Sequence, residues 1–170
     1  NFNLFLHSQI KPGKLTFVRG ELLDSRTLDK IITDVDVVYH LAAENSDNDK
    51  LHHLHEQVNN WGTAELVYAI EESKVKQLVY GSSTAVYGYS DNEFDIYSIP
   101  EPTTSLGSST LRGEQHVERI MSKINTQIIR LGNVFGYGVS MNMKGILNSL
   151  LFDSHFVSRI SIHGSGNQKR

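Results

Sequence analysis

The sequence contains no cysteine, which excludes disulfides, thiol nucleophiles and thiolate metal sites. It has no run approaching the roughly 20 apolar residues of a membrane span. Its first six residues lack the basic start and the cleavage site of a signal peptide. The net charge is only -3, with 21% charged residues, which argues against a nucleic-acid or membrane partner. We therefore expect a soluble cytoplasmic protein that binds neither nucleic acid nor membrane.

Apolar runs of strand length alternate along the chain with segments of helical period. A chain of 170 residues, 39% of them hydrophobic, is long enough for one buried core. The alternation predicts an α/β fold, in which a parallel sheet of strands buried on both sides is covered by helices on both faces. Strands are expected at residues 15–18, 35–40, 77–81 and 127–131, with another possible at 159–162. Helices are expected at residues 25–32, 49–73, 107–123 and 144–153.

Small and polar residues follow each of the four main expected strands. Glu21 follows the first, Ala42 and Ala43 the second, Ser82 and Ser83 the third, and Asn133 the fourth. Ligands of open parallel sheets bind beyond the carboxyl ends of the strands, so these are candidate ligand contacts. Taken singly, the serines also fit a solvated turn and the alanines close helix packing.

Five motifs occur in a recognisable order. They are the residues of 40–43 (His-Leu-Ala-Ala), 59–63 (Asn-Asn-Trp-Gly-Thr), 82–88 (Ser-Ser-Thr-Ala-Val-Tyr-Gly), 133–136 (Asn-Val-Phe-Gly) and 164–170 (Gly-Ser-Gly-Asn-Gln-Lys-Arg). In this order the sequence resembles the NAD-dependent epimerase/dehydratase family of extended short-chain dehydrogenases. The resemblance implies a Rossmann-like doubly wound parallel sheet. It also implies that residues 1–170 are one partial NAD(P)-binding domain, with 141–170 leading into the substrate-binding part.

The resemblance assigns roles by position. It implies that NAD or NADP is the cofactor and that a nucleotide sugar is the substrate; we assign no metal ligand. A homodimer through the two long helices is carried as an analogy. The implied adenine contacts are Glu21 and Leu22; the ribose and pyrophosphate contacts are Leu41, Ala42 and Ala43; the nicotinamide contacts are Asn59 and Ser82; the catalytic hydroxyl is Ser83; and the sugar-nucleotide contacts are Ser83, Asn133 and Arg170.

The sequence departs from the family at its beginning. Relatives start with a strand, a glycine-rich turn, a helix and a second strand, none of which precedes residue 15 here. We therefore expect a fragment whose sheet is incomplete at the N-terminus. Because the glycine-rich turn supplies the helix N-terminus that holds the pyrophosphate, cofactor binding by this chain alone should be weak or absent.

The catalytic positions also depart from the family. In the register of the family's Tyr-x-x-x-Lys motif, Leu106 replaces the tyrosine and Thr110 the lysine. Leucine has no proton to exchange and threonine has no charge, so catalysis should be impaired. The chain is then an impaired epimerase/dehydratase, a non-catalytic binding or regulatory homologue, or a degenerate remnant. Tyr87 and Tyr97 are possible substitutes, although Tyr87 is more typical of a structural tyrosine.

The start of the second expected helix is rich in histidine. His52, His53, His55 and Glu56 could suggest a metal site, but the set lacks the spacing of a closed ligand group, and a solvated helix face is favoured. Trp61, further along this helix, is expected to pack in the core or against another helix.

Overall fold

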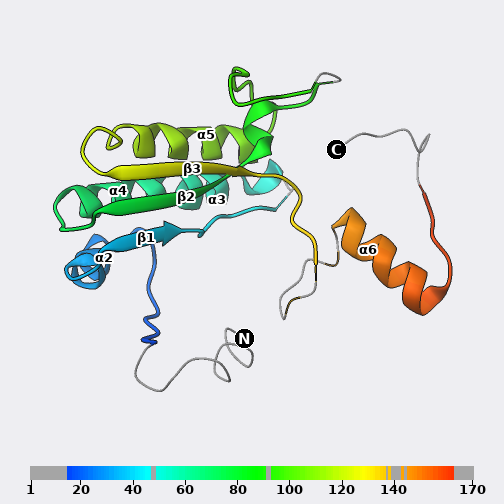
Figure 1. Cartoon of the computed structure of the whole chain (residues 1–170), viewed down its shortest axis with the longest axis horizontal. Helices are drawn as coiled ribbons and strands as arrows, with labels where there is room; N and C mark the ends of the chain where they lie inside the picture. The colour runs from blue at the N-terminus through cyan, green and yellow to red at the C-terminus, as the bar shows by residue number, and fades with distance from the viewer. Residues whose placement is uncertain are drawn as a thin grey trace. The chain divides into compact units, whose positions relative to one another are not determined.

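The computed structural model describes residues 15–46, 49–90, 93–136, 138, 143 and 145–162. These residues belong to two compact units, one formed by Val18–Gly132 and the other by Asn1–Phe17 with Asn133–Arg170. The sheet and most of the helices belong to the first unit (Figure 1).

Three parallel strands form the sheet of the first unit. They are β1 (Val37–His40), β2 (Gln77–Ser83) and β3 (Asn125–Leu131), in the order β1-β2-β3. Val37 pairs with Gln77 and His40 with Tyr80, while Ser83 at the end of β2 pairs with Leu131. The strands at 35–40, 77–81 and 127–131 are thus confirmed, with shifted ends.

The other two expected strands are wrong. Residues 15–18 and 159–162 are neither helix nor strand. A strand exists only through bonds to a neighbour, and the described sheet pairs β1, β2 and β3 with one another.

The helices follow the predicted periodicity closely. Helix α2 spans Ser25–Ile32, as expected, and the Asp24 carboxylate caps it by accepting from the Thr27 amide at 3.3 Å. The helix expected at 49–73 consists of four consecutive helical segments. The helix expected at 107–123 begins two residues before its predicted start and ends five residues before its predicted end. The four segments are η1 (Asp49–Leu51), α3 (His52–His55), the π-helical η2 (Glu56–Gly62) and α4 (Thr63–Glu71); the later helix is α5 (Ser105–Glu118).

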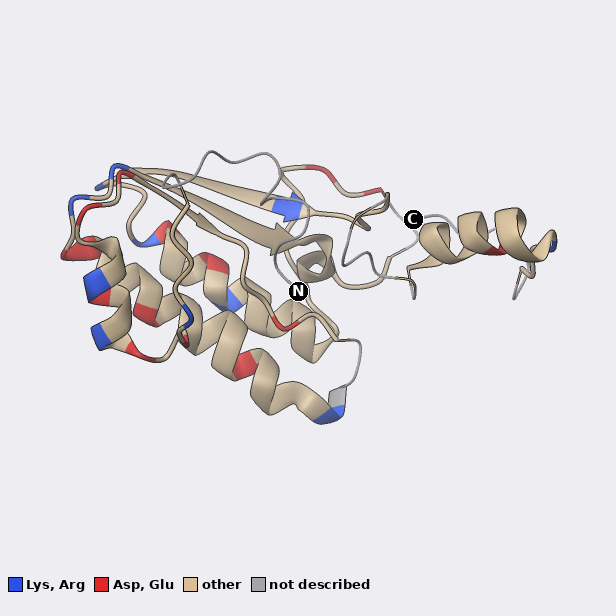
Figure 2. Cartoon of the chain, turned by 90° about the horizontal axis from the view of Figure 1, so that it is seen from below, with Lys and Arg blue, Asp and Glu red and all other residues tan. Residues whose placement is uncertain are grey.

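The helices of this unit gather on one side of the sheet (Figure 2). Leu66, Val67 and Ile70 of α4, Leu78 of β2 and Val117 of α5 form the centre of the core between the two layers. On β1 and β3, alternate residues such as Tyr39, Ile129 and Leu131 are exposed. Burial on both sides was therefore predicted correctly for β2, which has a neighbouring strand on each side. It was predicted wrongly for β1 and β3, because in the described residues helices pack against one face only.

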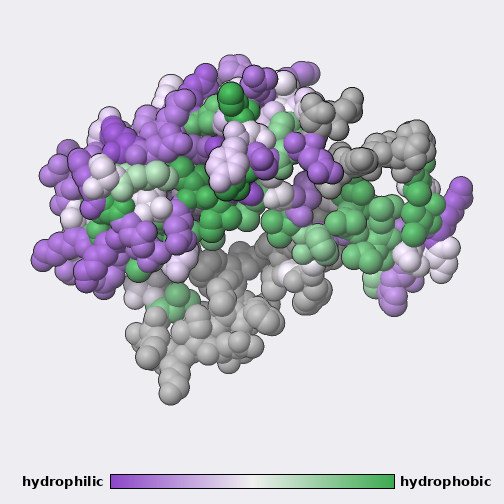
Figure 3. All heavy atoms as spheres, turned by 45° about the horizontal axis from the view of Figure 1, so that its top comes forward, coloured by the Kyte–Doolittle hydropathy of each residue, from purple (hydrophilic) through white to green (hydrophobic). Residues whose placement is uncertain are grey.

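The second unit contains α6 (Ile146–Phe152), followed by the π-helical η4 (Asp153–Val157). The helix predicted at 144–153 is confirmed. Its surface is largely apolar (Figure 3), with Leu151 and Phe156 exposed and the Asn148 side chain accepting from the Gly136 amide at 3.0 Å. No helix within the described ranges is long and apolar enough to cross a membrane.

Candidate functional site

A groove of about 310 Å³ lies between α2 and the end of β1. Its lining brings together three of the residues predicted to contact the cofactor, namely Leu22, Leu41 and Ala42, with His40 beside them. The lining is apolar, and its volume is at the lower end of the range for small-molecule sites. The predicted contacts of Leu22, Leu41 and Ala42 with the cofactor stay predictions. Glu21 and Ala43, next to these lining residues in the chain, are exposed.

Leu41 connects this groove to the exit of β2. A Cβ added to Gly81 would come within 2.9 Å of Leu41 Cδ2, so the absence of a side chain at Gly81 lets Leu41 lie over the strand. Two residues further, Ser83 is half-buried, and its hydroxyl accepts from the Ala85 amide at 3.1 Å. This bond caps the short helix η3 (Thr84–Tyr87) and holds the Ser83 side chain at the carboxyl end of the strand.

A buried ion pair joins α5 to β3 beneath these strand ends. Glu114 is fully buried, and its carboxylate accepts from Arg130 Nη2 at 2.7 Å and from Arg130 Nε at 2.9 Å. The Ser82 hydroxyl donates to the same carboxylate. The Glu114 carboxylate raises the pKa of Arg130 above its ordinary value, mainly through these hydrogen bonds. Ser82 is thus held by a structural network, and its predicted cofactor contact stays a prediction.

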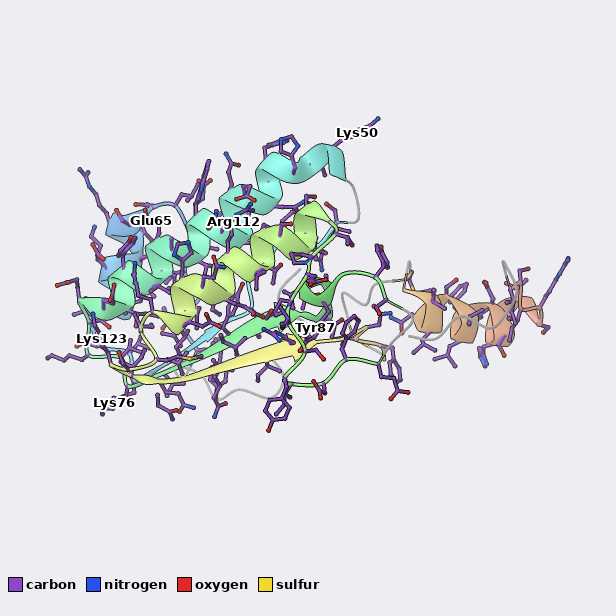
Figure 4. All side chains as sticks on the ribbon, turned by 90° about the horizontal axis from the view of Figure 1, so that it is seen from above. Lys50, Glu65, Lys76, Tyr87, Arg112 and Lys123 are labelled. Atoms are coloured by element: carbon purple, nitrogen blue, oxygen red, sulfur yellow. The ribbon has the colours of Figure 1, made fainter. Side chains whose placement is uncertain are left out.

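Tyr87, which is also buried, completes this network. Arg130 Nη1 donates to the Tyr87 hydroxyl at 2.7 Å, and that hydroxyl donates to the Asp95 carbonyl at 3.1 Å. The ring stacks on Phe94 with centroids 4.8 Å apart. Figure 4 shows Tyr87 near one end of the strands, while Lys76 and Lys123 lie at the other. Because both hydrogen-bonding capacities of its hydroxyl are used, Tyr87 is poorly suited to exchange protons with a substrate.

Asn59 ties the loop after β1 to the helices. Its side-chain oxygen accepts from the Glu44 amide at 2.8 Å, and its nitrogen donates to the Glu44 carbonyl at 2.9 Å and to Ser109 Oγ at 3.1 Å. The side chain is 2% exposed. Asn59 therefore shapes the rim that carries Ala42 and Ala43, and its contact with the nicotinamide stays a prediction.

A second buried polar group lies under the groove. His40 Nε2 is 2.9 Å from the Thr63 hydroxyl, and Tyr80 also bonds to Thr63. Burial lowers the pKa of His40 to about 4 and raises the pKa of Tyr80 to about 12. Both side chains are thus neutral near pH 7, as their apolar surroundings require.

Leu106 and Thr110 lie one turn apart near the start of α5. Leu106 is half-buried and Thr110 is 5% exposed. Ser109 lies on the side of α5 that faces Asn59, and Gly107 lies on the side that packs on Ala85. Because successive residues of a helix are about 100° apart, Leu106 and Thr110 project between these two sides. Neither side chain can donate a proton in the way that a tyrosine supported by a lysine does.

The predicted sugar-nucleotide contacts of Asn133 and Arg170 stay predictions. Asn133 is exposed and belongs to the other compact unit, and Arg170 lies outside the described residues. The solvated-face hypothesis holds for His52 and His53, which are exposed, and is wrong for His55, which is fully buried. Trp61 is 54% exposed, so it does not lie in the core, and its packing against another helix stays a prediction.

Comparison with known proteins decides the family. A sequence model described as the NAD dependent epimerase/dehydratase family matches residues 4–170, which is nearly the whole chain. The chain belongs to the NAD-dependent epimerase/dehydratase family. The family fold that the motifs predicted, a Rossmann-like parallel sheet with helices, is thereby confirmed.

Similar proteins act on several activated sugars. The chain is 31% identical over 161 residues to dTDP-D-glucose 4,6-dehydratase of Homo sapiens, covering 91% of this chain and 45% of the relative. It is 30% identical over 135 residues to N-acetyl-alpha-D-glucosaminyl-diphospho-ditrans,octacis-undecaprenol 4-epimerase of Escherichia coli O157:H7, covering 77% and 41%. The chain thus spans less than half the length of these two relatives.

Solved structures of the family share the fold. UDP-glucuronic acid 4-epimerase of Bacillus cereus, solved in complex with NAD, matches with a TM-score of 0.78 and 26% identity, covering 90% of this chain and 49% of that one. The dTDP-glucose 4,6-dehydratase of Streptomyces venezuelae matches with a TM-score of 0.79 at 21% identity, which shows the fold alone.

Sequence analysis did not predict the polar side chains that are buried in this protein. Glu114, Arg130 and Thr63 were not singled out as functional residues, and His55 was assigned to the surface. Their partners come from other segments, up to 50 residues away in the case of His55 and Ser105. One signal was available for the ion pair: a glutamate within a helix and an arginine within an apolar strand, both at positions that should be buried.

Proposed function

We propose that this chain forms the cofactor- and substrate-binding core of a nucleotide-sugar epimerase/dehydratase in which the usual proton exchange is impaired. The observation that carries the proposal is the shared groove at the end of β1. Leu22 in the turn before α2 and Leu41 and Ala42 directly after β1 line one apolar groove of about 310 Å³. The NAD in the related Bacillus cereus enzyme supports the choice of a nicotinamide dinucleotide.

In this proposal each element has a distinct task. Glu21 and Leu22 border the adenine. The ribose and pyrophosphate are lined by Leu41, Ala42 and Ala43. The Ser82 and Asn59 networks fix the strand ends near the nicotinamide half. Bound NAD or NADP supplies a hydride acceptor. Ser83, Asn133 and Arg170 are assigned to the sugar nucleotide. An arginine suits a diphosphate because its planar guanidinium forms paired charge-assisted bonds.

The impaired step is the proton transfer. Leu106 and Thr110 occupy the positions of the family's tyrosine and lysine, and their side chains carry neither an acidic proton nor a positive charge. Positioned acid/base catalysis contributes about 10²- to 10⁴-fold, so a loss of this order is expected. The alternative is a homologue that binds the same ligands without turnover, and the absence of both catalytic side chains favours it equally.

The proposal also includes a homodimer through the long helices, in a cytoplasmic protein. Trp61 and Tyr68 are 54% and 51% exposed, and Arg119 stacks on the Tyr68 ring with 4.5 Å between its guanidinium carbon and the ring centroid. Aromatic residues and arginine are enriched at protein interfaces. This surface supports a second copy of the chain as the partner.

Ligand binding tests the proposal directly. NAD and NADP are titrated by calorimetry into the native protein purified from its cells. The same titrations are made with the 170-residue chain alone. Ala42→Phe should fill the groove and weaken binding at least about tenfold, or about 1.4 kcal/mol. Gln57→Phe adds a similar bulk at an exposed helix position and should leave binding unchanged. Equal affinities of the native protein and the Ala42 variant would contradict the proposed site.

A further inference from the structure

Ser83 lies between two residues that are both anchored to one buried ion pair. Ser82, which precedes it at the end of β2, donates its hydroxyl proton to the Glu114 carboxylate. Tyr87, which follows Ser83 at the end of η3, accepts a hydrogen bond from Arg130 Nη1 at 2.7 Å. Glu114 and Arg130 are themselves joined by two hydrogen bonds. The backbone on both sides of Ser83 is therefore held by the same pair.

Arg130 has the side chain that can make these contacts together. Its Nε and Nη2 donate to the two carboxylate oxygens of Glu114, while Nη1 donates to the Tyr87 hydroxyl. The guanidinium carbon also lies 4.8 Å from the centroid of the Tyr87 ring. A lysine carries its charge on a single ammonium nitrogen, so it cannot span the carboxylate and the phenol with the same fixed fork. Arg130 thus links α5, β3 and η3.

The Ser83 hydroxyl keeps a proton that it can donate. Successive residues of a strand point to opposite faces of the sheet, so Ser82 points toward α5 and Ser83 points away from it. Ser83 Oγ accepts from the Ala85 amide at 3.1 Å, and no group within the described ranges accepts its proton. The side chain is half-buried at the carboxyl end of β2, where ligands of parallel sheets bind. Its oxygen is thus held by one bond, while its proton is available to a ligand.

We propose that Arg130 is a positioning residue for the Ser83 hydroxyl. Through Glu114 and Tyr87 it pins the backbone on either side of Ser83 and keeps the hydroxyl in the orientation that donates to the ligand. This rests on the proposed function, in which Ser83 contacts the sugar nucleotide. The group that accepts the hydrogen bond is then an oxygen of the sugar. Arg130 acts through Ser83 and needs no contact of its own with the ligand.

A change at Tyr87 tests the positioning without any ligand. Arg130→Lys would leave Glu114 with an incomplete partner and destabilise the fold, so a milder change is needed. Tyr87→Phe keeps the aromatic ring and removes only the hydroxyl that Arg130 binds. The readout is the proton chemical shift of the Ala85 amide, because this amide donates to Ser83 Oγ. Since a hydrogen bond moves an amide proton downfield, the signal should move upfield in Tyr87→Phe.

Two further variants calibrate this shift. Ser83→Ala gives the value of the Ala85 amide without its acceptor, and the signal in Tyr87→Phe should move from the native value toward it. Tyr89→Phe removes the hydroxyl of an 85% exposed tyrosine and should leave the signal at the native value. An unchanged Ala85 amide in Tyr87→Phe would overturn the proposal.

A double-mutant cycle tests whether the effect on the ligand passes through Ser83. UDP-glucose is titrated by calorimetry into the native protein, Tyr87→Phe, Ser83→Ala and the double variant, each incubated with NAD. Ser83→Ala should weaken binding about fivefold, as for the loss of one hydrogen bond, and Tyr87→Phe should weaken it by up to that factor. The double variant should bind no more weakly than Ser83→Ala, because the two changes remove the same contact.

Losses that multiply in the double variant would overturn the positioning role. Absence of UDP-glucose binding by the native protein would instead count against the proposed function. The Ala85 amide shift still decides the positioning in that case, because it needs neither NAD nor a sugar nucleotide.

Discussion

Glu114 of α5 and Arg130 of β3 form a two-point ion pair inside the protein, with nitrogen–oxygen distances of 2.7 and 2.9 Å. The carboxylate is almost wholly enclosed, at 1% exposure, whereas the guanidinium side chain keeps 24%. The pair holds Ser82 on one side and Tyr87 on the other. It therefore fixes the strand ends where we place the ligands.

Removing the carboxylate should destabilise the fold strongly. In Glu114→Ala, Arg130 loses its partner in a mostly buried position, and breaking such a pair costs about 3 kcal/mol or more. Urea unfolding followed by circular dichroism measures the loss. Glu118→Ala, an exposed glutamate on the same helix, should change stability by less than about 0.5 kcal/mol. A small effect at position 114 would show that the pair contributes little.

Gly113 should not tolerate a side chain. A Cβ there would overlap the Tyr80 hydroxyl and come within 2.6 Å of the Asn59 carbonyl oxygen, which is backbone. Gly113→Ala should cost about 2 kcal/mol through overpacking, and adding Tyr80→Phe should recover part of that loss. At Gly132 nothing lies within 4 Å of an added Cβ, so Gly132→Ala serves as the control for thermal unfolding. An unchanged melting temperature for Gly113→Ala would contradict this packing.

The fold could be predicted where local pattern and burial agree. Helix α2 was predicted to the residue because Asp24 caps it and its apolar side faces the core. The segment at 15–18 has the same apolar character as β1, but a strand also needs a partner, which local sequence does not reveal. His55 was predicted at the surface and is buried, whereas Trp61 was predicted to pack and is exposed. The helical period gives the spacing of the residues on one face but does not tell which face points to the core. Ser105 supplies the partner that allows a histidine to be buried.

Stability should fall as the solution is acidified through the range in which His40 titrates. Burial lowers its pKa from 6.5 to about 4 in the folded protein. The unfolded chain therefore takes up the proton first, so the stabilising contribution is complete above pH 6.5 and is lost progressively as the pH falls toward 4. The loss should approach about 3 kcal/mol.

The variant His40→Gln isolates this effect, because glutamine can still bond to Thr63 but does not titrate. The free energy of unfolding is measured by urea denaturation at pH 7.5 and at pH 5 for native, His40→Gln and His53→Gln. The pH-dependent loss should be smaller in His40→Gln alone, since His53 is exposed. Identical losses in all three proteins would show that His40 is not the titrating group.

The long helices should mediate self-association. Introducing charge at Trp61 or Tyr68, as Trp61→Glu or Tyr68→Glu, should shift the protein from dimer to monomer in sedimentation velocity. A charge in the centre of an interface must be desolvated without a partner, which costs several kcal/mol. Tyr97→Glu is the control, because Tyr97 is 84% exposed and lies outside these helices. A native protein that is monomeric at all concentrations would contradict the proposed partner.

Restoring the missing catalytic pair tests the central claim most directly. UDP-hexoses are added to the native protein, purified from its cells and incubated with NAD. The formation of reduced nicotinamide is followed by its absorbance. Leu106→Tyr with Thr110→Lys should raise the rate about 10²- to 10⁴-fold over the native sequence. The matched pair Leu106→Phe with Thr110→Met, of similar bulk, should not raise it. A native protein that already turns over as fast as the restored variant would contradict the account.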